Sequence, residues 1–77
     1  ISNTINLRTV ESEIAKSLTS VQDKNKDVEI GSYPFFRAGK LGVAIVIRSV
    51  EQSKIDICNA QILDFVNQKN IQIIINE

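Results

Sequence analysis

The 77-residue sequence contains no histidine, no methionine and no tryptophan, and only one cysteine, Cys58. Histidine is the commonest general base and the commonest protein metal ligand, so its absence argues against many catalytic and metal sites. A single thiol cannot form an internal disulfide, which fits a reducing compartment such as the cytoplasm. We therefore expect no catalytic residue and no metal site within this sequence.

A surplus of charge and a long hydrophobic run are also missing. Nine Lys and Arg balance nine Asp and Glu, and hydrophobic residues make up 43% of the chain. A neutral domain lacks the broad basic field that attracts nucleic acid, and no apolar run approaches the roughly 20 residues that cross a bilayer. We expect one small α/β domain over residues 1–77, cut from a larger protein, with neither nucleic acid nor membrane as a partner.

Hydrophobic periodicity predicts the order β-α-β-β-α-β. Thr9 and Ser53 are the expected N-caps of two helices with one apolar stripe each, the second running to about Lys69. The residues between the two middle strands, 37–42, include two glycines and predict a hairpin loop. The four expected strands cover residues 4–8, 28–32, 43–49 and 71–75.

This order predicts an α+β, ferredoxin-like two-layer sandwich, with both helices on one face of a four-stranded, mainly antiparallel sheet. Right-handed crossovers place the second and fourth strands at the sheet edges. Pro34 falls in the second strand region, and an edge is where a sheet tolerates proline.

The most unusual segment is the aromatic run that surrounds Pro34. It is followed by cations in a stretch, residues 30–50, that contains no acid. Aromatic side chains beside an edge strand could pack inside the domain, or they could dock on a neighbouring domain. The cations could be solvated, or they could face an acidic or phosphorylated partner. The candidate interaction surface consists of Tyr33, Pro34, Phe35, Phe36, Arg37, Lys40 and Arg48.

A second pattern, Gly39-Lys40-Leu41-Gly42, matches the GXXG loop of the KH nucleic-acid-binding module. In that module the loop joins two helices and clamps the nucleic-acid backbone. Here it joins two predicted strands, which favours a plain hairpin turn. Nucleic-acid binding through Lys40 remains the alternative function.

The run VEIGSYP, residues 28–34, resembles a stretch of the competence/damage-inducible protein A (CinA) family. It is also similar to the molybdopterin-binding-like region of FAD synthases. In those proteins the run follows a helix like residues 11–18 and precedes a strand like residues 42–48. The resemblance extends over about residues 10–66.

The resemblance implies a small KH-like α/β domain that follows a larger MoaB/Mog-like domain. The nucleotide or molybdopterin, its divalent metal and the catalytic residues would belong to that larger domain, so no cofactor is expected here. The parent would be an FAD synthase or a nucleotide pyrophosphatase-like enzyme. This chain would then be an accessory domain that packs on the catalytic domain or forms a homodimer.

Overall fold

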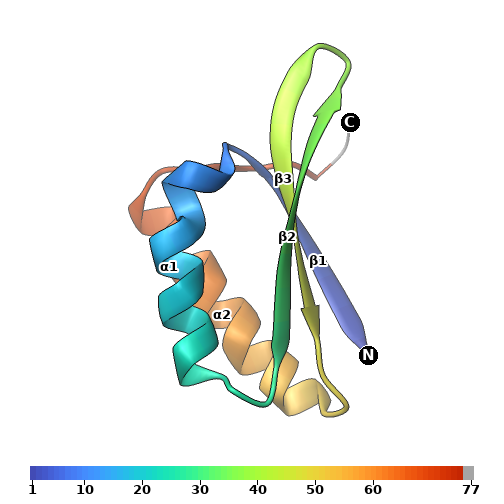
Figure 1. Cartoon of the computed structure of the whole chain (residues 1–77), viewed down its shortest axis with the longest axis vertical. Helices are drawn as coiled ribbons and strands as arrows, with labels where there is room; N and C mark the ends of the chain where they lie inside the picture. The colour runs from blue at the N-terminus through green and yellow to red at the C-terminus, as the bar shows by residue number, and fades with distance from the viewer. Residues whose placement is uncertain (76–77) are drawn as a thin grey trace.

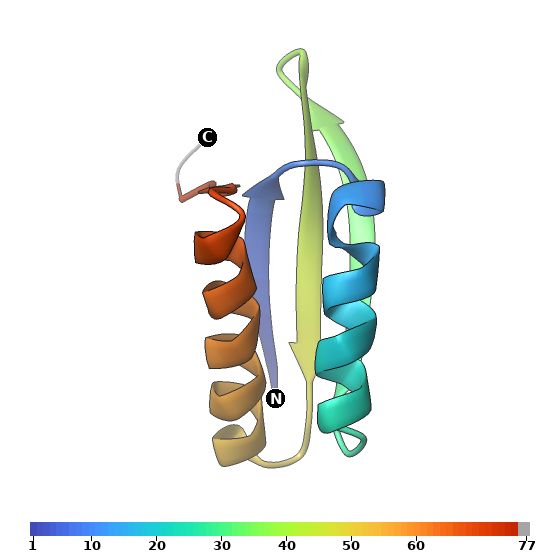
Figure 2. The same cartoon turned by 90° about the vertical axis from the view of Figure 1, so that its left-hand side faces the viewer.

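The computed structural model describes residues 1–75 and contains four strands and two helices (Figure 1). The strand order is β2-β3-β1-β4, and each neighbouring pair is antiparallel. Both helices cover the same face of the sheet (Figure 2). The predicted α+β sandwich is confirmed, with β2 and β4 at the edges. The elements are β1 (Ser2–Arg8), α1 (Glu11–Lys24), β2 (Glu29–Arg37), β3 (Lys40–Arg48), α2 (Gln52–Gln68) and β4 (Gln72–Ile73).

The core lies between the sheet and the two helices. Side chains alternate along a strand, so every second residue of β1 and β3 points towards the helices. The apolar stripes of both helices meet these residues, as their spacing predicts, although Val10 stays 40% exposed at the start of α1. The buried residues are Ile5, Leu7, Ile14, Val21, Val28, Val43, Ile45, Ile47, Ile55, Cys58, Ile62 and Val66.

The predicted N-caps are wrong at both helices. Val10 and Glu51 occupy the N-cap positions, and neither makes a side-chain capping hydrogen bond. Ser53 lies inside the first turn of α2, while Ser49 Oγ accepts a hydrogen bond from the Glu51 N–H. Both N-cap positions are exposed, so water can satisfy the first N–H groups of each helix without a side-chain cap.

The predicted hairpin is confirmed, but its loop is shorter than residues 37–42, because the turn has only two residues. Ala38 and Gly39 both have positive φ, 52° and 76°, as in the type I′ turns that join tightly paired strands. The backbone pairing therefore continues outwards to Arg37↔Lys40, and each strand has nine residues. Pro34 lies within β2, whose outer edge has no strand neighbour in the described sheet.

The last strand is shorter than the expected 71–75. β4 pairs with β1 at Leu7↔Ile73 and Arg8↔Gln72, and one further hydrogen bond joins the Ile74 N–H to Asn6 O at 2.8 Å. Ile73 stays 41% exposed, so pairing of β4 with β1 buries little apolar surface and a longer β4 would gain little stability. Within residues 1–75, neither helix is long and apolar enough to cross a membrane.

Candidate functional site: the β2–β3 hairpin

The β2–β3 hairpin extends beyond the helices and beyond β1 (Figures 1 and 2). The register of β1 with β3 ends at Leu7↔Val43, whereas that of β2 with β3 continues to Arg37↔Lys40. We call residues 35–42 the hairpin arm. Its shape follows from the two-residue turn, which keeps both strands paired to their ends.

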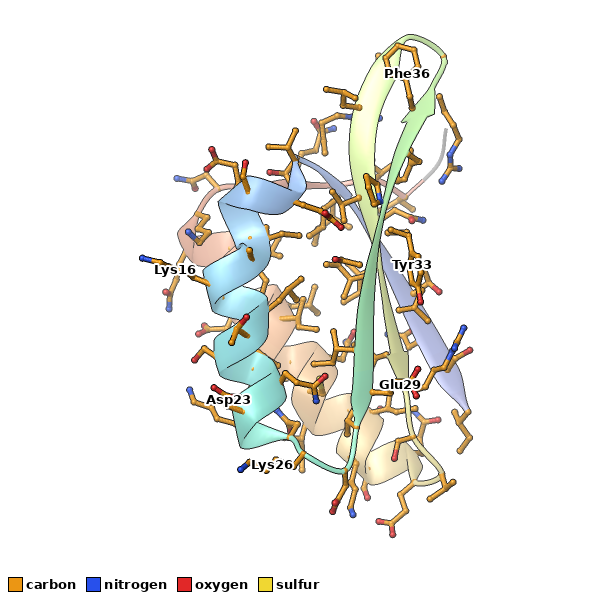
Figure 3. All side chains as sticks on the ribbon, viewed as in Figure 1. Lys16, Asp23, Lys26, Glu29, Tyr33 and Phe36 are labelled. Carbon is orange, nitrogen blue, oxygen red and sulfur yellow. The ribbon has the colours of Figure 1, made fainter. Side chains whose placement is uncertain are left out.

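One side of the arm carries an exposed apolar pair. Phe36 lies opposite Leu41, and the two side chains are 67% and 56% exposed. Both point to the side of the sheet that the helices cover further down, because they alternate with residues of the open face. Ser32 Oγ donates a hydrogen bond of 2.9 Å to Glu11 Oε1 in the first turn of α1, so the helical layer ends before Phe36 is reached (Figure 3).

The other side belongs to the open face of the sheet, where two aromatic rings rest on glycines. A Cβ atom placed on Gly31 would lie 2.7 Å from Tyr33 Oη. A Cβ atom placed on Gly42 would lie 2.6 Å from Phe35 Cε1. Aromatic side chains often cover sheet glycines in this way, because the missing side chain leaves room for a ring. Phe35 is held in the arm, while Tyr33 keeps 51% of its surface exposed.

The cations of the predicted surface divide into two groups. Arg37 and Lys40 lie opposite each other at the turn, and the Arg37 guanidinium sits 4.1 Å from the centre of the Phe35 ring. Arg48 lies at the other end of β3, about 26 Å along the strand from Lys40. There it forms an exposed ion pair of 3.8 Å with Glu29. The structure thus groups Phe35 with Arg37 and Lys40, places Phe36 on the other side of the arm, and places Arg48 at the far end of β3.

The comparison with protein families identifies the chain. The model of the family described as FAD synthase, middle domain, matches residues 1–74. The chain belongs to this family. The match confirms the FAD synthase part of the resemblance. No curated protein and no solved structure matches the chain.

Cys, Asp and Glu are the potential metal-ligating and nucleophilic side chains of the FAD synthase middle domain. Among residues 1–75, no group of three or more Cys, Asp and Glu side chains could hold a metal ion. Cys58 is buried in the core, and burial raises the pKa of its thiol, which keeps it protonated and unreactive. The GXXG residues lie in a strand–strand setting, with Gly39 in the turn and Gly42 beneath the Phe35 ring.

Two residues of the middle domain's hairpin region were missed by the sequence analysis. Leu41 completes the apolar pair with Phe36, and Arg8 Nη1 donates a hydrogen bond of 2.7 Å to Leu41 O at the base of the arm. A two-residue turn at Ala38 and Gly39 would have put Leu41 opposite Phe36. Strand alternation after the apolar Leu7 would have placed Arg8 on the open face.

Proposed function

We propose that this chain is an accessory domain of an FAD synthase and packs on a neighbouring domain of that enzyme through the hairpin arm. The family description, a middle domain, supports a position between other domains. The observation that carries the proposal is the exposed pair Phe36 and Leu41 on an arm outside the domain's own core. The chemistry on nucleotide or molybdopterin, with its divalent metal, would belong to the neighbouring domain.

Burial of this pair would give the contact a useful free energy. Full burial of one such side chain stabilises by about 1.5–3 kcal/mol, so covering the exposed parts of both contributes about 2–4 kcal/mol. Tethering two domains in one chain makes such a modest contact sufficient, because the effective concentration of the partner is high.

The edge of β2 also favours docking by side chains. Pro34 has no N–H to offer to an additional strand, and proline on an edge blunts strand pairing. Phe36, by contrast, projects from the paired strands of the arm (Figure 3), and the exposed Leu41 lies opposite it. We infer that a neighbour receives the apolar pair in a pocket.

The test uses a full-length FAD synthase that carries this domain, with Phe36→Ser and Leu41→Ser combined. Docking would be lost, so limited proteolysis should cut the segments that flank the domain several-fold faster. The control is Ile57→Ser, because Ile57 is 55% exposed but lies on α2, away from the arm. Both variants should leave the urea midpoint of the 77-residue chain nearly unchanged. Equal cleavage rates in the wild-type enzyme and the double variant would contradict docking through the arm.

A further inference from the structure

The neutral chain separates its charges between two sides. Four cations and one acid lie on the open face, a net charge of +3, because each alternates with a residue that points to the helices. The rest of residues 1–75 has five cations and seven acids, a net charge of −2. The composition alone conceals this basic face. Its charged residues are Arg8, Arg37, Lys40, Arg48 and Glu29.

We propose that the open face binds single-stranded nucleic acid, with a base stacked on Tyr33 and phosphates held by Arg37 and Lys40. The Tyr33 ring is 51% exposed and is positioned over Gly31, so it offers an accessible surface without a large loss of side-chain freedom. Base–aromatic stacking and a basic groove are the two components of general single-strand binding.

The arm places the cations for contacts of this kind. Arg37 packs on the Phe35 ring, which orients its guanidinium, and Lys40 stands directly opposite. From Tyr33 to Arg37 is four strand residues, about 13 Å, so a base and nearby phosphates of one short strand can reach both. Between them the Phe35 ring covers Gly42, and Ala44 stands opposite Tyr33.

Single strands fit this surface better than a duplex does. The bases of a duplex are already stacked and paired, whereas stacking on a sheet needs unpaired bases. The surface also differs from the apolar pair of the proposed function, since Phe36 and Leu41 point to the opposite side of the arm. The two proposals therefore depend on different residues, and failure of one does not contradict the other.

The test is fluorescence anisotropy of labelled oligothymidylate with the 77-residue chain. With Arg37 and Lys40 each neutralising one phosphate, log K should fall with log[salt] with a slope of about −1.4, or about sevenfold between 50 and 200 mM salt. Tyr33→Leu keeps an apolar cover on Gly31 but removes the aromatic ring, and should weaken binding at least about fivefold. Arg37→Gln combined with Lys40→Gln should weaken binding and flatten the salt dependence.

Two control variants carry matched changes elsewhere. Lys16→Gln removes a cation from α1, on the other side of the molecule, and Phe36→Ser removes an aromatic ring from the other side of the arm (Figure 3). Both should bind like the wild type. Three results would overturn the proposal: no salt-sensitive binding, equal binding by Tyr33→Leu, or equally strong competition by polyglutamate. The last result would indicate an acidic protein surface as the partner.

Discussion

Replacing Gly42 with alanine should destabilise the domain more than the same change at Gly31 or Gly39. A Cβ atom on Gly42 would overlap the Phe35 ring, with 2.6 Å to Cε1, and would lie 3.0 Å from the Leu7 carbonyl oxygen. The carbonyl belongs to the central strand β1 and cannot retreat, so the ring must move. We expect a loss of about 2–3 kcal/mol, in the range of overpacked sites.

The other two glycines set the scale. At Gly39 no atom lies within 4 Å, but the φ of +76° strains any L side chain, so alanine should cost about 1 kcal/mol. At Gly31 the nearest atom is Tyr33 Oη, at the far end of an exposed side chain that can rotate away. That rotation offsets the usual gain of about 0.5–1 kcal/mol on replacing a strand glycine, so the net change should be near zero.

Urea denaturation measures all three variants, and a double-mutant cycle tests the cause. Phe35→Ala removes the ring that the new methyl group strikes, so Gly42→Ala should cost at least about 1 kcal/mol less in that background. In thermal unfolding, each 1 kcal/mol corresponds to a shift of about 4–8 °C. Equal costs at Gly42 and Gly31, or independence from Phe35, would refute the packing of this ring on Gly42.

Three further predictions concern the rest of the domain. Cys58→Ser should cost about 1–3 kcal/mol because it buries a hydroxyl among apolar side chains, and Ellman's reagent should react with the wild-type thiol only as fast as unfolding exposes it. Gln22→Ala should cost about 1–3 kcal/mol by urea denaturation, because its side-chain amide hydrogen-bonds three backbone groups before and within β2, among them Val28 O at 2.6 Å. A hydrogen bond from Lys54 lowers the pKa of Asp27, so their pair should stabilise the fold above the ordinary aspartate pKa and lose that effect as pH falls below about 4. Asp27→Asn should remove this part of the acid transition. An acid titration that the substitution leaves unchanged would contradict the pair.

The fold could be predicted because its signals repeat. On α2 the buried residues Ile55, Cys58, Ile62 and Val66 recur at helical spacing, so no single residue decides the assignment. The position of Pro34 then agreed with a topology that depended only on the order of elements. An assignment based on such a repeated pattern remains correct even when each boundary is wrong by one or two residues.

The details of the site depend on single residues, and there the sequence was less informative. The turn has Ala38 at its first positive φ, where asparagine or aspartate is the usual signal, so a two-residue hairpin was not recognised. Without that register, Phe35 and Phe36 could not be assigned to opposite sides of the arm. Arg48 is close to Lys40 in sequence, but the extended strand separates them.

The central claim is that the arm docks on a neighbouring domain of an FAD synthase, and amide hydrogen exchange tests it most directly. The exchange rates of residues 36–41 are to be compared between the 77-residue chain and a full-length FAD synthase that contains it. Docking predicts at least tenfold slower exchange in the arm of the full-length enzyme, while residues 56–60 on α2 keep their rates. Equal exchange in the arm of both proteins would contradict the claim.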